Sequence, residues 1–220
     1  MEAFVAYTFI DNLNQPLPDA ALKSLPSIMK DEINLYKMND DQIRLLAGKR
    51  LLYYALQITN HESDMIQQYT VAPNGKPFIP GFHPFNITHS GNIVAIAVLL
   101  SRGEIGIDCE MIRPIQPSSF TKQFSPPEMQ WILNAQQPQQ RFFDAWTMKE
   151  AVMKADGRGM RIPLHHIRLK KDYATIDDNP NIWFLYPLSL HPNHPAHLCS
   201  DQAISNIKTI HILTNDLWLL

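Results

Sequence analysis

WTMKEAVMKADGRG, residues 146–159, has the spacing of a helix with one buried face, and the rest of the chain is interpreted from it. The apolar residues that follow the i, i+3, i+4, i+7 pattern of a buried face are Met148, Ala151, Val152 and Ala155. Glu150 and Lys154 stand one turn apart and share another side of the same helix. Gly157 and Gly159 supply the left-handed residue at which such a helix ends. The stretch therefore predicts a core helix that presents a carboxylate and an ammonium group.

The composition indicates a globular protein of one large domain or two small, closely joined ones. The chain has 220 residues, of which 45% are hydrophobic and 18% are charged. A formal charge of -2 excludes the strongly basic surface of a nucleic-acid-binding protein, but it permits a local basic pocket for a phosphorylated small molecule. Cys109 and Cys199 cannot form a disulfide framework. Because no signal peptide or membrane span is recognisable either, we expect a soluble, cytoplasmic protein.

Apolar periodicity and turn residues predict an α+β fold of two similar halves, 1–103 and 104–220, each with a small antiparallel sheet and a long helix. The elements expected in the first half are a strand at 3–10, a helix over about 39–58 and the first strand of a hairpin that spans 93–110. The elements expected in the second half are a helix begun by a Ser125–Glu128 capping box, a helix from Pro138 into 146–156, and strands at 164–170, 182–188 and 204–213. Residues 191–200, rich in Pro and His, are expected to form an exposed loop.

The sequence GIDCE, residues 106–110, predicts a cation site at the end of a strand. Side chains alternate along a strand, so Asp108 and Glu110 point to one face, while Ile107 and Cys109 point into the core. Two carboxylates about 7 Å apart repel one another unless a positive group lies between them. Mg²⁺ binds through a few carboxylates together with waters and substrate phosphates. The alternative is a strand end with two solvated acids.

Glu150 and Lys154 have three interpretations. They form an ordinary i,i+4 ion pair, or Glu150 completes a capping box with Thr147, or Glu150 is a third metal ligand while Lys154 holds a phosphate. The capping box requires a helix that begins at Thr147, whereas Pro138 and Phe142 indicate an earlier start.

Further polar residues offer weaker signals. Residues 86–91, NITHSG, bring together two hydroxyl groups, an imidazole and the backbone amides beside Gly91, and these groups can donate hydrogen bonds to phosphate oxygens. A lone histidine in a turn, however, is more often structural. The basic residues Arg44, Lys76 and Lys30 are individually typical of a solvated surface. Ligand types that suit zinc occur at His191, His194, His197 and Cys199, but the prolines between them argue against a metal site.

Five motifs in order resemble those of the Sfp-type 4′-phosphopantetheinyl transferases. They are GKP at 75–77, FNITHSG at 85–91, GIDCE at 106–110, FSPPE at 124–128 and WTMKEAVMKADGRG at 146–159. The resemblance covers about residues 40–165. It implies a pseudo-twofold fold of two similar halves and a monomeric enzyme that interacts with neither nucleic acid nor membrane. The implied reaction is transfer of the phosphopantetheine arm of coenzyme A to a serine of an acyl, peptidyl or aryl carrier protein, with release of adenosine 3′,5′-bisphosphate.

The resemblance also implies roles for individual residues. Asp108, Glu110 and Glu150 would hold Mg²⁺, and Lys154 would neutralise phosphate charge. The proton of the carrier serine would pass to Glu150 or, as the alternative, to Glu128. The residues implied in coenzyme A binding are Arg44, near the 3′-phosphate, and Lys76, Pro77, Thr88 and His89. Family members often carry two lysines before the long helix of the first half, and this chain departs from that pattern because only Lys30 and Lys37 are nearby.

Two other functions remain open at the level of the sequence. A Mg²⁺-dependent hydrolase of nucleotide pyrophosphates would use the same acidic residues without a protein acceptor. A carrier-binding module with a decayed site would need none of them. The chain has no GxxxxGK[ST] or GxGxxG motif, so a nucleotide would not bind through those loops.

Overall fold

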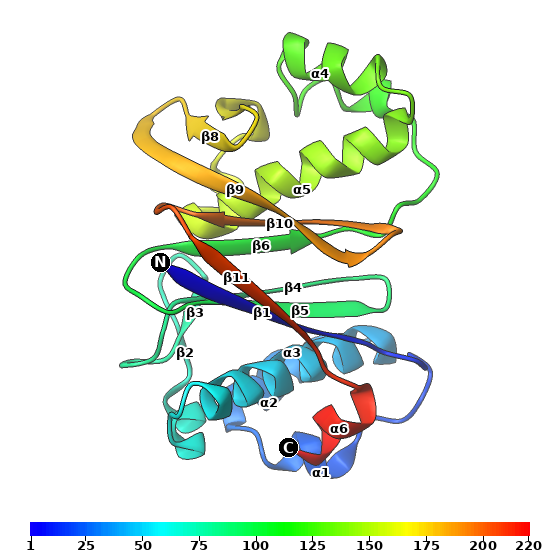
Figure 1. Ribbon diagram of the computed structural model, residues 1–220. Coiled ribbons are helices and arrows are strands. Elements are labelled where there is room, and N and C mark those ends of the chain that lie inside the picture. Colours follow the sequence, from blue (N-terminus) through cyan, green and yellow to red (C-terminus); the bar gives the residue numbers. More distant parts are fainter. The chain divides into compact units, whose positions relative to one another are not determined.

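The computed structural model describes residues 1–220, which divide into two compact units. The N unit comprises residues 2–102 and 206–220, and the C unit comprises Met1 and residues 103–205. Each unit has a sheet with a long helix against it, in the α+β arrangement that the sequence predicts (Figure 1). The expected C-terminal half, 104–220, is therefore divided: its last segment lies in the N unit, because its strand pairs with the first strand of the chain.

The N unit is built on a four-stranded sheet of order β11-β1-β5-β4. Strand β1 pairs in parallel with β11 and antiparallel with β5, which in turn pairs antiparallel with β4. Every residue of β5 is buried, as its continuous apolar run predicts. The strands are β1 (Glu2–Phe9), β4 (Phe85–Ser90), β5 (Ile93–Leu99) and β11 (Asn206–His211), with β2 (Thr70–Val71) and β3 (Pro77–Phe78) as a separate pair.

The long helix α3 packs on this sheet, as Figure 1 shows. It spans Asn39–Ile58, the range that the sequence predicts, and its buried side chains join those of β5 in one core. The shorter helices of the N unit are α1 (Asp19–Lys23), α2 (Ser27–Asn34), the 3-10 helix η1 (Ser63–Gln68) and α6 (Thr214–Leu219).

The C unit is built on an antiparallel sheet of order β6-β10-β9-β8-β7. The predicted hairpin over 93–110 is wrong, because β5 and β6 belong to different sheets and β6 pairs with β10 instead. The strands are β6 (Ile105–Cys109), β7 (Ile167–Leu169), β8 (Tyr173–Ile176), β9 (Asn179–His191) and β10 (His194–Ser200).

The predicted exposed loop at 191–200 is also wrong. Its residues form the turn of the β9–β10 hairpin and then β10, in which every residue is buried. Pro195 is accommodated because the pairing of β10 with β9 shifts register between His194 and Ala196, where a missing N–H does not interrupt the ladder.

Helix α5 (Pro138–Asp156) crosses the C-unit sheet and is preceded by α4 (Pro126–Leu133). The predicted capping box of Ser125 and Glu128 begins α4. Helix α5 has proline in its first turn and ends at Gly157, whose φ of 82° is left-handed. The remaining short helices are η2 (Pro117–Phe120), η3 (Gly159–Arg161) and η4 (Leu164–His166). None of the helices combines the length and apolar character that crossing a bilayer requires.

Candidate active site

Gly106 lets helix α5 lie directly against strand β6. A Cβ atom on Gly106 would stand 2.1 Å from the carbonyl oxygen of Ala151 and 2.4 Å from the amide nitrogen of Ala155. Only glycine permits this approach of backbone to backbone. Asp108 follows two residues later on the strand and Glu150 precedes Ala151 on the helix, so the close packing brings acidic groups of both elements together.

Lys154 and Asp108 form an ion pair between the helix and the strand. The Lys154 Nζ donates to Asp108 Oδ1 at 2.7 Å and to the carbonyl oxygen of Ile107 at 3.2 Å. The Asp108 side chain is buried and that of Lys154 is partly exposed. Burial alone would lower the pKa of Lys154, but the adjacent Asp108 carboxylate raises it above its ordinary value. The ammonium group is therefore charged at neutral pH.

Glu150 lies in the same electrostatic environment as the two acids of the β6 motif. Burial raises the pKa of Glu150, the carboxylates of Asp108 and Glu110 raise it further, and Lys154 opposes them, so that it reaches about 7. A carboxyl group with this pKa takes up or releases a proton near neutral pH. The three acids and the lysine that the sequence singles out thus lie in the C unit, near enough for Asp108, Glu110 and Lys154 to influence the charge of Glu150.

The donor set of these three acids suits a hard divalent cation. Asp108, Glu110 and Glu150 supply only carboxylate oxygens, and a positive charge among them would relieve the repulsion that raises the pKa of Glu150. In the structure, no group of three or more His, Cys, Asp or Glu side chains is close enough together to ligate a metal ion. The three residues therefore fit a cation in charge and chemistry without being gathered into a closed ligand cluster.

Glu128, the alternative acceptor of the serine proton, is held by several hydrogen-bond donors. Its Oε2 accepts from the Ser125 amide at 2.8 Å and from Lys149 Nζ at 2.9 Å, and its Oε1 accepts from the Leu169 amide at 2.9 Å. Burial would raise the pKa of Glu128, but these donors together lower it. Glu128 joins α4, α5 and β7, and it stays ionised.

Lys149 is a buried lysine that is not among the residues predicted for the site. Its side chain is fully buried, and its Nζ also donates to the carbonyl oxygens of Leu164 at 2.9 Å and Ile167 at 2.7 Å. One signal was available: Lys149 shares the i, i+4, i+7 spacing of Ala145 and Val152, both core residues. A lysine within an apolar stripe indicates a buried partner of opposite charge.

Thr147 does not cap a helix, so the capping-box interpretation of Glu150 is wrong. Helix α5 begins nine residues earlier, at Pro138, and the Thr147 hydroxyl lies 2.9 Å from the carbonyl oxygen of Phe143 inside the helix. The same hydroxyl lies 2.8 Å from Nδ1 of His197 on β10. Burial lowers the pKa of His197 to about 4, so this imidazole is neutral at physiological pH.

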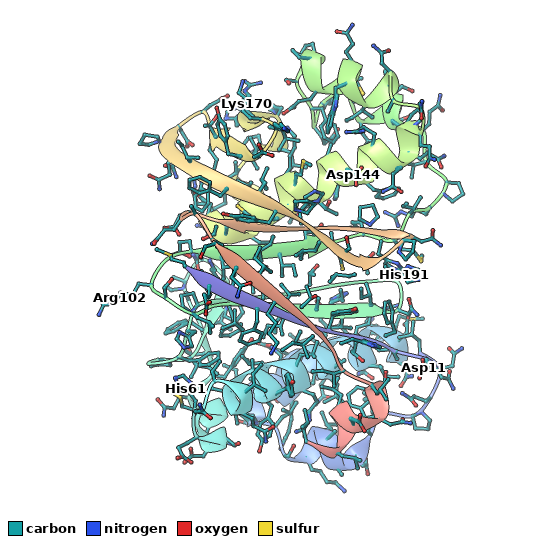
Figure 2. The ribbon with its side chains drawn as sticks, viewed as in Figure 1. Asp11, His61, Arg102, Asp144, Lys170 and His191 are labelled. Carbon is teal, nitrogen blue, oxygen red and sulfur yellow. The ribbon has the colours of Figure 1, made fainter.

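The other two histidines of the Pro/His-rich segment meet at the β9–β10 turn. The Nδ1 atoms of His191 and His194 are 3.1 Å apart, and the Asn193 amide donates to His191 Nδ1 at 3.1 Å. Figure 2 labels His191 at this turn. His197 instead contacts helix α5, so the three rings do not converge on one point.

Arg44, the basic residue expected near the 3′-phosphate, lies on α3 of the N unit. Its Nη1 is 3.0 Å from an oxygen of Asp40 and 2.8 Å from one of Asp41, and its Nε donates to the Gly91 carbonyl oxygen at 2.6 Å. The guanidinium group therefore orients the β4–β5 turn and is already balanced by two acids.

The remaining residues implied in coenzyme A binding lie on or beside the strands of the N unit. Thr88 is buried and His89 is exposed on β4. Neighbouring residues of a strand project from opposite faces of the sheet, so the two side chains do not extend in the same direction. Lys76 lies in the turn before β3, where its amide donates to Asn74 Oδ1 at 3.1 Å, and Pro77 begins β3.

Two basic residues of α3, Lys49 and Arg50, are buried. Lys49 Nζ donates to Glu32 and, at 2.6 Å, to the hydroxyl of Tyr69. Arg50 donates to Ser24 Oγ at 2.8 Å and to the carbonyl oxygen of Leu220. These cations fasten α2 and the C-terminal segment to α3 and are not exposed to solvent.

Residues 104–184 match the model of the 4′-phosphopantetheinyl transferase superfamily. A 4′-phosphopantetheinyl transferase of Bacillus subtilis is 30% identical over 161 residues, which cover 70% of this chain and 70% of that protein. The transferase ffp of Bacillus subtilis is 28% identical over 86% of this chain and 87% of its own length. HetI of a Nostoc species, also named a 4′-phosphopantetheinyl transferase, is 41% identical over 65% of each chain. The matched region contains the strand with Asp108 and the helix with Glu150 and Lys154, and the chain belongs to the 4′-phosphopantetheinyl transferase superfamily.

Proposed function

We propose that this transferase moves the 4′-phosphopantetheine arm of coenzyme A to a serine of an acyl, peptidyl or aryl carrier protein. The observation that carries the proposal is the ion pair of Lys154 on α5 with Asp108 on β6, whose charges both act on Glu150 of the same helix. A titratable carboxyl group beside a fixed ammonium group provides a proton acceptor and a phosphate-binding cation in one place.

Asp108, Glu110 and Glu150 would hold Mg²⁺. When bound, the ion would neutralise the pyrophosphate of coenzyme A. The support for this assignment is the all-carboxylate donor set and its mutual repulsion in the structure.

In the proposed reaction, the serine oxygen forms a bond to the phosphorus that carries the pantetheine arm. The bond from that phosphorus to the bridging oxygen breaks, and adenosine 3′,5′-bisphosphate leaves with the electron pair. Glu150 or, as the alternative, Glu128 takes the serine proton. Lys154, charged and anchored to β6, faces the phosphoryl oxygens as negative charge develops on them.

The N unit would supply the contacts to the nucleotide end of coenzyme A. Lys76, Thr88 and His89 offer an ammonium, a hydroxyl and an imidazole, and Pro77 offers an apolar surface. Arg44 contributes through the β4–β5 turn that it holds. We further propose that the protein acts as a cytoplasmic monomer.

The test is intact-mass analysis of a panel of apo carrier proteins incubated with coenzyme A, Mg²⁺ and the purified protein. We expect at least one carrier to gain the mass of a phosphopantetheine group, and Glu150→Gln to abolish the gain while retaining the circular dichroism spectrum of the wild type. An unmodified panel would contradict the proposal. Cleavage of coenzyme A without any carrier would indicate a pyrophosphate hydrolase instead.

A further inference from the structure

Two polar contacts join helix α5 to the central strands of the C-unit sheet, which the helix crosses (Figure 1). One is the ion pair of Lys154 with Asp108 on β6. The other joins the Thr147 hydroxyl to Nδ1 of His197 on β10, at 2.8 Å. The side chains of this second contact are not among the groups assigned to the reaction, although they lie close to those of the first.

His197 is the direct neighbour of Asp108 across the β6–β10 pair. Residues that stand opposite one another in an antiparallel pair project from the same face of the sheet, with Cβ atoms about 5 Å apart. Gly106, two residues before Asp108, adjoins the backbone of α5, so this is the face that the helix covers. The His197 side chain is buried on that face. It therefore lies beside the acidic site and under α5.

Glu150 depends on the helix for its position. Thr147 stands three residues before Glu150 and seven before Lys154, a spacing that places all three on one side of α5. Glu150 itself forms no hydrogen bond or ion pair, and only burial and the charges of its neighbours act on it. The buried Lys149 fastens another side of the helix, toward α4 and β7. On the side that carries Glu150, the contacts before and after it are those of Thr147 and Lys154.

Of these two contacts, only that of Thr147 with His197 is independent of the substrate. Lys154 cannot be a permanent fastening, because the proposed reaction turns its ammonium group toward the phosphoryl oxygens. Thr147 and His197 are both buried, so a substrate does not compete for them. The Thr147 hydroxyl donates its one hydrogen to the carbonyl oxygen of Phe143 at 2.9 Å, so the Nδ1–H of His197 donates to the hydroxyl oxygen. The hydroxyl thus links the backbone of α5 to β10.

We propose that Thr147 and His197 are positioning residues of the transferase, which hold α5 at the rotation that keeps Glu150 beside Asp108 and Glu110. The inference rests on the proposed function, because Glu150 contributes to that reaction only from this position. Without the contact, this part of α5 is free to turn away from β10 when Lys154 moves to the substrate. A displacement of about 1 Å at a reacting group is enough to slow a reaction by about 100-fold.

The experiment compares two pairs of full-length variants that differ in this hydrogen bond. His197→Asn keeps a nitrogen donor near the position of Nδ1, whereas His197→Gln keeps one only near Nε2. Thr147→Ser keeps the hydroxyl, and Thr147→Val removes it at nearly constant shape. We expect kcat for carrier modification to fall about tenfold or more in His197→Gln and Thr147→Val, with the KM of both substrates within about twofold of the wild type. The kcat of His197→Asn and Thr147→Ser should stay within about threefold of the wild type.

A second measurement needs neither coenzyme A nor a carrier. Mg²⁺ should raise the melting temperature less in His197→Gln and Thr147→Val than in the wild type, because a displaced Glu150 no longer completes the donor set. Thr8→Val is the matched control, since it removes a buried hydroxyl that lies 3.3 Å from that of Thr214 in the N unit. It should lower the melting temperature without changing kcat or the effect of Mg²⁺.

The outcomes separate this inference from the proposed function. An active wild type whose kcat is shared by all four variants would overturn the positioning role alone. Equal losses in both members of each pair would overturn it too, because they would assign the effect to side-chain volume rather than to the hydrogen bond. A kcat that falls only as far as the folded fraction does would make the contact purely structural. A wild type that modifies no carrier would overturn the proposed function and this inference with it.

Discussion

At the scale of single residues, the site depends on how burial and neighbouring charges set the protonation of each group. Glu150 has a pKa of about 7 because it is partly buried beside other acids, whereas the hydrogen-bond donors around the buried Glu128 lower the pKa of that carboxyl group and keep it ionised. The sequence could identify both carboxylates, but it could not rank them as bases. That ranking depends on Lys149 and on the amide of Leu169, which approach Glu128 only in the folded chain.

The raised pKa of Glu150 predicts a pH-dependent stability of the metal-free protein. The folded state binds this proton more tightly than the unfolded state, whose carboxyl group titrates near 4.5. The contribution of this group to stability is therefore fully present below about pH 4.5 and is lost as the pH rises through about 7, by about 3 kcal/mol. Thermal melts should show that Mg²⁺ raises the Tm more at pH 8 than at pH 5. Glu150→Gln should lose most of this difference, and an unchanged difference would contradict the assignment.

The buried position of Lys149 predicts that replacing this residue greatly lowers the stability of the protein without directly removing a group that takes part in the reaction. Lys149→Met leaves the Glu128 carboxylate buried without its cation, which costs about 3–5 kcal/mol in urea unfolding. The double variant Lys149→Met/Glu128→Gln should recover part of that loss, because it removes the unpaired charge. Lys122→Met, at an exposed lysine, should change stability by less than about 0.5 kcal/mol. Equal losses at Lys149 and Lys122 would exclude a buried ion pair as the cause.

At the scale of elements, the contact of α5 with β6 sets the position of the site. Gly106→Ala would place a methyl group 2.1 Å from the Ala151 carbonyl oxygen, so the helix must move away from the strand. We expect a loss of about 3 kcal/mol or more and a fall in transfer activity measured on the fraction that remains folded. Gly48→Ala is the control, since its methyl group meets side chains rather than backbone, Ile87 at 3.0 Å and Val94 at 3.7 Å, and alanine favours the helix. A normal rate for Gly106→Ala would show that the spacing of helix and strand is not critical.

Helices and strands whose signals lie close together in the sequence could be predicted. Elements that depend on pairing with a strand far away in the sequence could not. The long helix α3, the capping box of α4 and the early start of α5 all follow from residues within a few turns of one another. The prediction of a hairpin over 93–110 was wrong because strands that are adjacent in the sequence need not pair with each other, and β6 pairs with β10 instead. Strand β10 could not be predicted because its prolines and histidines are typical of a loop. Its burial comes from the strands β6 and β9 on either side of it.

At the scale of the whole molecule, the C unit is an insertion within the N unit. The chain leaves the N unit after Arg102 and returns to it at Asn206. Near these points the Glu104 amide donates to Asp201 Oδ1 at 2.8 Å, so the two ends of the inserted segment are adjacent. The division could not be read from the sequence, because nothing local to residues 206–211 indicates that β1 is their partner.

This connectivity predicts that residues 103–205 fold alone. The fragment contains its whole sheet and α5, and its ends already meet, so we expect cooperative thermal unfolding and a dispersed NMR spectrum. The fragment 1–102 lacks β11 and α6, which leaves β1 as an open edge and removes two contacts of Arg50, so it should aggregate. A disordered 103–205 fragment would show that the C unit needs the rest of the chain.

The parallel pairing of β1 with β11 has a consequence for synthesis on the ribosome. β1 is synthesised before residues 103–205 and its partner β11 after them, so the whole C unit is made between the two strands. β1 must therefore wait until β11 has left the ribosome before that edge of its sheet is covered. A nascent chain stalled before residue 206 would already contain Asp108, Glu150 and Lys154 but would lack β11, so synthesis of β11, rather than of the acidic residues, would complete the N unit.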